Sequence, residues 1–329
     1  MSASRAAVSR RAFLLAGLAA AMPLPAWAQA QGRRLGILAM GAREVETPLW
    51  SEMLGHLGGL GYKEGSNLAV AWRFASDSTE KLQQLARELA GSRLHAVATM
   101  GTPATRALQR ATATIPIVTG GVTDPVLGGF AQTVARPGRN VTGLSLGGTE
   151  VATLQIGLLK SMLPNLARLA LVRGSGDWTD HEIVAPIAAA AKTQGITVAP
   201  VLARDGASLD AALRDLRAGD RMSAAFIYHA DQITPLQVAE LALRNKVPTM
   251  FEERGWVAAG GLMAYSMHHR DPMKQLAQIL VNILRGAPAA DSPFELPVSS
   301  YFVINVRTAA SLGVPVPPQL LVRADETIG

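Results

Sequence analysis

The chain has 329 residues, no cysteine, and a formal net charge of +6 from 31 basic and 25 acidic side chains. The lack of cysteine excludes disulfides and thiolate metal sites, and scattered charge with few aromatic residues argues against nucleic-acid binding. A chain of this length exceeds one ordinary hydrophobic core and predicts two domains.

Residues 1–28 have the order of a removable export signal. Arg10 and Arg11 form a paired-arginine box, an apolar run follows from Phe13 to Met22, and Ala26-Trp27-Ala28 supplies the small residues of a cleavage site. This order predicts a twin-arginine signal peptide, cleaved after Ala28 or Ala30, and a periplasmic or extracytoplasmic protein. The apolar run is shorter than the roughly 20 residues of a membrane span, so a transmembrane anchor is the second alternative.

Short apolar runs then alternate with segments of helical period. Arg168–Arg173 is apolar at nearly every interior position, as expected of a parallel strand covered on both faces. In Thr79–Ala90 the leucines recur at three- and four-residue steps, with Asp77 or Ser78 as the N-cap and Gly91 at the end. The alternation predicts two α/β lobes with doubly wound parallel sheets. The proline-rich stretch Leu312–Gly329 is expected to wrap the surface without adding a regular layer.

Ligands of open α/β sheets bind beyond the carboxyl ends of the strands, where this sequence places small and polar residues. Free backbone N–H groups at helix N-termini suit a carboxylate, and acidic side chains suit an ammonium group, so together they would recognise a zwitterion. Each residue has the alternative of a helix cap or a turn. The candidates are Met40, Gly41, Gly101, Thr102, Pro103, Thr123 and Asp124 in the first lobe and Ser175, Asp231 and Glu252 in the second.

Two short patterns point elsewhere. Residues 143–147 match the G-x-S-x-G nucleophile elbow, and histidines lie downstream, so an exported serine hydrolase using Ser145 is an alternative. The same segment falls at the predicted passage between the two lobes, where a hinge also needs small residues, and this argues against the hydrolase. His268 and His269 would point to opposite faces of a strand, which argues against a shared metal ion. Nucleotide-binding glycine motifs are absent, and we expect no cofactor.

An ordered series of motifs resembles one known family. Gly101-Thr102-Pro103-Ala104, Ile115-Pro116-Ile117-Val118, Asp124-Pro125-Val126 and the run from Ala135 to Gly143 (ARPGRNVTG) occur in that order. Further matching segments lie at Leu60–Asn67, Ala259–Tyr265 and Pro317–Glu326. The series resembles the ABC-transporter substrate-binding proteins that include tryptophan- and tyrosine-type binding proteins, and it covers essentially the whole mature chain.

The resemblance implies a type I periplasmic-binding-protein fold with discontinuous lobes. Lobe 1 would comprise residues 33–145 and about 267–300, and lobe 2 residues 146–266 and about 301–329. The implied crossings follow Asn140–Ser145, follow Gly261–Ser266 and lie near Tyr301–Val306.

The resemblance also implies a function without catalysis. The protein would be a monomeric receptor that closes over a small polar solute, such as an amino acid, and docks on an ABC permease. The implied contacts are residues 101–103, Thr123 and Asp124 in the first lobe, and the second-lobe counterparts near Ser175, Asp231 and Glu252. A sensory module for a membrane signalling protein would use the same binding chemistry and is a further alternative.

Overall fold

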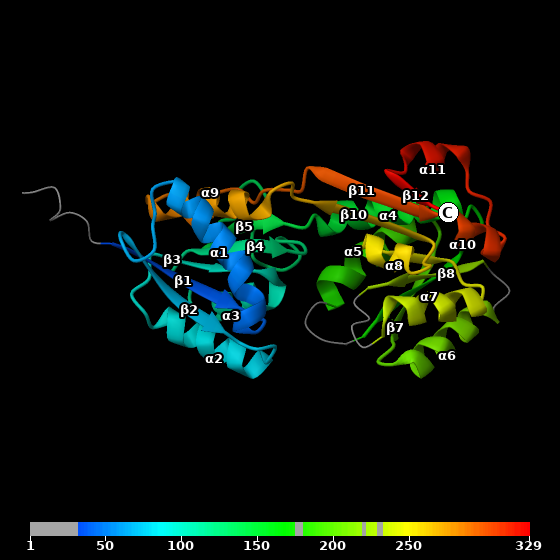
Figure 1. Ribbon diagram of the computed structural model, residues 1–329, viewed down its shortest axis with the longest axis horizontal. Coiled ribbons are helices and arrows are strands. Elements are labelled where there is room, and N and C mark those ends of the chain that lie inside the picture. The colour runs from blue at the N-terminus through cyan, green and yellow to red at the C-terminus, as the bar shows by residue number, and fades with distance from the viewer. Residues whose placement is uncertain (1–31, 175–179, 219–221, 229–232) are drawn as a thin grey trace, which may run out of the picture.

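The computed structural model describes residues 32–174, 180–218, 222–228 and 233–329, which form two α/β lobes side by side along the long axis of the molecule (Figure 1). The predicted signal peptide, Ser175 and Asp231 lie outside these ranges. Within them, the helices are too short or too polar to cross a bilayer.

The first lobe is built on a parallel sheet of five strands. Its order is β2 (Leu68–Phe74), β1 (Arg33–Ala39), β3 (Ala96–Thr99), β4 (Ile117–Val122) and β5 (Val141–Ser145). Its helices are α1 (Arg43–Gly59), α2 (Thr79–Ala90), α3 (Gly101–Ala111) and the late helix α9 (Pro272–Leu284).

Alternating side chains of β1 determine which helices cover each face of this sheet. Leu35 and Ile37 pack in one cluster with α1 and α9, which contribute Trp50 and Leu276 among others. Leu38 points the other way into a cluster with α2 and α3. The two-residue period of the strand therefore produces a sheet with helices on both faces.

The second lobe contains a seven-stranded sheet. Its order is β12 (Glu326–Ile328), β11 (Ser299–Asn305), β10 (Met263–His268), β9 (Thr249–Phe251), β8 (Ser223–Ile227), β6 (Arg168–Arg173) and β7 (Thr197–Leu202). The helices of this lobe are α4 (Gly148–Met162), α5 (Asp180–Thr193), α6 (Gly206–Arg217), α7 (Pro235–Arg244), α8 (Arg254–Ala258), α10 (Val306–Leu312) and α11 (Pro318–Arg323). The 3-10 turn η2 (Ala289–Asp291) precedes β11. Buried residues of α4 and α5 share one core cluster, and those of α6 and α7 share another.

The sequence pattern predicted a wholly parallel second sheet, and the structure differs from this prediction in one pair of strands. β11 runs antiparallel to β10, from the pair Met263–Ile304 to the pair His268–Ser299. The physical reason is the path of the chain. It leaves the second lobe after β10, forms α9 on the first lobe, and returns through β11 in the opposite direction.

Local sequence signals determine several element boundaries. Arg168–Arg173 and Thr79–Ala90 have the predicted bounds. The Ser78 hydroxyl accepts a hydrogen bond from the Lys81 backbone N–H at 3.2 Å, and Gly91 forms the C-cap of α2. The helix α1 was not predicted, because Pro48 and three glycines weaken its helical pattern.

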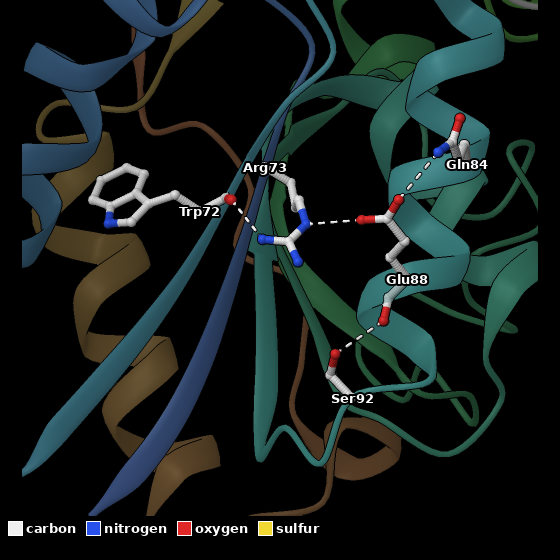
Figure 2. A network of polar contacts seen from close by, with 5 residues as sticks. All are labelled: Trp72, Arg73, Gln84, Glu88 and Ser92. Atoms are coloured by element: carbon white, nitrogen blue, oxygen red, sulfur yellow. Dashed lines mark hydrogen bonds and ion pairs between the residues drawn. The ribbon is translucent and has the colours of Figure 1, made fainter.

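Polar contacts on the outer surface of the first lobe fix α2 against β2 (Figure 2). The Arg73 guanidinium lies 3.1 Å from a carboxylate oxygen of Glu88, and the other oxygen accepts a hydrogen bond from Gln84 at 3.2 Å. The Ser92 hydroxyl donates to the Glu88 carbonyl and closes the end of the helix. These side chains are exposed, so the contacts orient the helix more than they stabilise it.

The C-terminal stretch was predicted to add no regular layer, and this is wrong. Residues 326–328 form β12, an edge strand parallel to β11. Glu326 accepts hydrogen bonds from Arg254 and from the Tyr301 hydroxyl. These contacts hold the pKa of the Glu326 carboxyl at about 2, with the Arg254 bonds as the main cause. Partners far apart in sequence thus bind a segment whose own pattern is too short to predict a strand.

Three connections join the lobes, and hydrogen bonds link them to one another. The first leads from β5 to α4, the second from β10 to α9, and the third from η2 to β11. Ser145 lies at the first. Its backbone N–H donates to the Glu295 carbonyl at 2.9 Å, and its carbonyl accepts from His269 Nε2 at 2.7 Å. One residue therefore contacts both other connections.

We expect Gly143→Ala to destabilise the fold by about 3 kcal/mol or more. Gly143 has φ +140°, and an added Cβ would clash with the backbone of Thr119 on β4, most severely with its carbonyl oxygen. The matched control is Gly157→Ala inside α4, where a Cβ meets nothing within 4 Å; it should stabilise by about 0.5–1 kcal/mol. Urea unfolding of both variants measures the difference, and equal free energies of unfolding would contradict the role of Gly143.

Candidate ligand-binding site

A cavity of about 240 Å³ opens between the two lobes. It lies at the carboxyl ends of β8 and β9, where the first lobe meets helices α4 and α5 of the second. The first lobe contributes Thr123 to the lining of the cavity, and the first connection between the lobes contributes Leu146. The lining residues are Thr123, Leu146, Gly148, Val151, Ala152, Gln155, Ile183, Ile187, Tyr228, Glu252 and Glu253.

One wall of the cavity is apolar. Val151 and Ala152 come from the first turns of α4, and Ile183 and Ile187 lie one helical turn apart on α5. These side chains also belong to the core of the second lobe. Because the core fixes them, the wall is formed before a ligand arrives and suits the apolar part of a small solute.

The lining of the cavity also includes two acidic side chains. Glu252 follows β9 directly, and Glu253 is the N-cap residue of α8. The Glu252 side chain is half-buried at the wall of the cavity. Desolvation raises the pKa of Glu252 to about 8, and the negative charge of Glu253 adds to the rise. A cationic group in the cavity would relieve both effects.

The polar turns of the first lobe are already hydrogen-bonded to one another. The Thr102 hydroxyl accepts from the Thr123 backbone N–H at 3.3 Å. One Asp124 oxygen accepts from the N–H groups of Val126 and Leu127, both at 3.0 Å, and the other accepts from the Thr149 hydroxyl at 2.7 Å. The Asp124 carboxylate therefore shapes its own turn and joins it to the first turn of α4.

The structure brings only part of the predicted site together. Thr123 and Glu252 line the same cavity, and Thr102 and Asp124 lie directly behind Thr123. Pro103 lines a separate groove with α2. The Gly41 N–H donates to Glu46 at 3.0 Å, Met40 packs against the first-lobe core, and Gly101 starts α3 with φ +80°; these three are not among the lining residues.

Sequence reasoning missed most of the second-lobe wall. Gln155 is a buried polar residue on an otherwise apolar face of α4, and its side-chain amide donates to the Tyr265 carbonyl at 2.8 Å. This interruption of the apolar pattern is a signal that the sequence contains. Ile183 and Ile187 carry no such signal, because lining residues and core residues look alike in sequence.

The geometry of Ser145 differs from that of a nucleophile elbow. Its side chain is buried, at 1% exposure, and its hydroxyl accepts a hydrogen bond from the Gly147 N–H at 3.1 Å. The nearby imidazole of His269 contacts the Ser145 backbone carbonyl and not its hydroxyl. An elbow needs an exposed hydroxyl on a strained turn. This serine supports the connection between the lobes.

Two α/β lobes, three connections and a cavity lined from both lobes define the type I periplasmic binding protein class, and solved structures share this fold. The sequence places the chain more narrowly. Residues 52–328 match the family model described as ABC transporter substrate binding protein. The chain belongs to this family, as the sequence analysis predicted.

Individual proteins that resemble this chain share less than a quarter of its residues. A tyrosine-binding protein from Clostridioides difficile (strain R20291) is 23% identical over 254 residues, which cover 77% of this chain and 72% of the relative. The crystal structure of an ABC domain in complex with L-Trp from Streptococcus pneumoniae has a TM-score of 0.71 at 22% identity, covering 90% of this chain and all of the other. The ligand-free, open structure of a substrate binding protein with adhesive properties from Clostridium difficile has a TM-score of 0.65 at 20% identity, covering 90% of this chain and 99% of the other.

We expect the stability of the protein to fall as pH rises from about 5 to about 8, with Glu252 as a main cause. The folded-state pKa of about 8 lies above the ordinary value of 4.5, so the folded protein binds more protons than the unfolded chain in this window. Glu252→Gln removes the charge. At pH 8.5 its free energy of unfolding should exceed that of the wild type by about 1–3 kcal/mol, and at pH 4.5 the two should be equal.

Urea unfolding at several pH values measures this effect. Glu240→Gln is the matched control, because Glu240 is an exposed acid on α7 away from the cavity. Parallel pH profiles for the wild type and Glu252→Gln would contradict a desolvated carboxyl at position 252.

Proposed function

We propose that this protein is the solute receptor of an ABC importer and that it binds a small amino acid-like solute in the cavity between its lobes. The observation that carries the proposal is a cavity with two different sides, an apolar wall on α4 and α5 and a desolvated acid at Glu252. A primary amine beside Glu252 and an apolar side chain against Ile183 and Ile187 would match it. The tyrosine- and tryptophan-binding relatives support an amino acid as the solute class.

Closure of the lobes is the proposed mechanism. Thr123 and Glu252 belong to different lobes, so a ligand that contacts both favours the closed arrangement by its differential affinity. The three connections would act as the hinge, since rotation of a few backbone angles near Ser145, His269 and Glu295 moves one lobe against the other. The second-lobe candidates Ser175 and Asp231 remain part of the proposed site.

The proposed setting is outside the cytoplasm. The paired arginines and cleavage motif of residues 1–30 would direct export, and the closed monomer would dock on a membrane permease. The family assignment supports this setting, since its members are substrate-binding components of ABC transporters. We propose no cofactor and no catalytic residue.

A ligand screen by thermal unfolding tests the proposal. The protein is first unfolded and refolded to remove bound solute, and then heated with single amino acids, their amines and other polar metabolites. A ligand at 100 times its dissociation constant should stabilise the fold by about 2.7 kcal/mol. A rise in melting temperature with one chemical class of solute supports the receptor function. An unchanged melting temperature across the whole panel contradicts it.

Variants of the cavity should weaken binding of the ligand that the screen identifies. Glu252→Gln removes the charge that meets the amine and should raise the dissociation constant about tenfold or more. Glu240→Gln serves as the matched control and should bind as the wild type does. Titration calorimetry measures both, and equal weakening by the two variants would place the ligand outside this cavity.

A further inference from the structure

We propose that Glu52, His56 and Asp271 form a zinc-binding site on the first lobe, away from the ligand cavity. One ligand atom from each residue lies within 4.8 Å of the other two. The site goes beyond the proposed receptor function, because the three residues are not among those that line the cavity between the lobes.

Two packed helices bring these side chains together. Glu52 and His56 are four residues apart on α1, so they lie on the same side of the helix, and His56 Nε2 lies 3.9 Å from a Glu52 oxygen. Asp271 is the N-cap residue of α9. Of the three, Asp271 lies more than 200 residues away in sequence, so the cluster results from tertiary packing.

The core beneath the cluster keeps its backbone positions fixed. Met53 and Leu57 of α1 are fully buried and share one hydrophobic cluster with Met273 and Leu276 of α9. On α1, Met53 directly follows Glu52 and Leu57 directly follows His56; on α9, Met273 lies two residues after Asp271. The proposed ligands are therefore displayed on a rigid base, and an ion needs only side-chain rotations to bind.

The donor set suits zinc. An imidazole nitrogen and two carboxylate oxygens are zinc ligands, and tetrahedral coordination at about 2.0–2.2 Å places neighbouring donors about 3.4 Å apart. The present spacing of up to 4.8 Å would close by small rotations of these side chains, of which Glu52 is exposed and the other two are half-buried. The two carboxylates balance the charge of a divalent ion. An imidazole ligand disfavours Mg²⁺ and Ca²⁺, which prefer oxygen.

Each residue keeps an atom available for the ion. One Asp271 oxygen accepts the capping hydrogen bond from the Lys274 N–H at 3.3 Å, which leaves the second oxygen for coordination. The side chains of Glu52 and His56 are 58% and 34% exposed. Solvent can thus deliver the ion and supply water as the remaining ligand.

Zinc at this position would also affect the second connection between the lobes. Asp271 comes two residues after His269, whose imidazole contacts the Ser145 carbonyl. An ion shared by α1 and Asp271 would fasten the start of α9 to the first lobe. It would stabilise that lobe and limit movement at this end of the connection.

Titration calorimetry of the tag-free, metal-stripped protein with zinc chloride tests the proposal. We expect one zinc ion per chain in the wild type. His56→Gln and Glu52→Gln change exposed side chains and should raise the dissociation constant at least tenfold. Asp271→Asn should do the same, and it separates metal binding from helix capping because asparagine is an equally good N-cap residue. His268→Gln alters an exposed histidine three residues from Asp271 and should bind zinc as the wild type does.

Thermal unfolding without metal shows whether each variant is folded. With zinc, the melting temperature should rise only in the wild type and in His268→Gln. Two results would overturn the site: no zinc binding by the wild type at 100 µM metal, or equal affinity in the wild type, His56→Gln and Asp271→Asn. Neither result depends on the solute or on the receptor function, so failure here leaves the proposed function intact.

Discussion

The placement of the two lobes depends on the backbone of Ser145. Its N–H and its carbonyl are bonded to Glu295 and His269, so the three chain segments that cross between the lobes meet at one buried residue. A buried backbone group without a partner is costly, and this cost keeps the three segments in register. The cavity begins directly beside this junction, because Leu146 follows Ser145 in the chain and lines the cavity.

The cavity combines a stable wall with an unfavourable charge. Ile183 and Ile187 belong to the hydrophobic core of their lobe, so the apolar side gains stability from folding alone. Glu252 is held where its ionised form is poorly solvated, with the pKa raised to about 8. Groups that a fold strains in this way are typical of binding sites, because a ligand of opposite charge recovers the lost free energy.

Asp124 shows why acidic turn residues are ambiguous in a sequence. Its position after a strand suggested an ammonium-binding acid, but its oxygens accept hydrogen bonds from two backbone N–H groups and from Thr149. The same carboxylate chemistry serves a turn, a helix start or a ligand. Only the neighbours in space decide among these uses, and here they join the first lobe to α4.

The sequence by itself determined the α/β class and elements such as the strand Arg168–Arg173 and the helix Thr79–Ala90, because periodicity and capping act over a few neighbouring residues. Its motif series also identified the family. Tertiary structure alone decided that β11 runs antiparallel to β10 and that residues 326–328 form an edge strand. It also decided which residues share a cavity, since Thr123, Gln155 and Glu252 meet only through contacts between distant segments. Such contacts depend on the path of the whole chain and leave no local pattern.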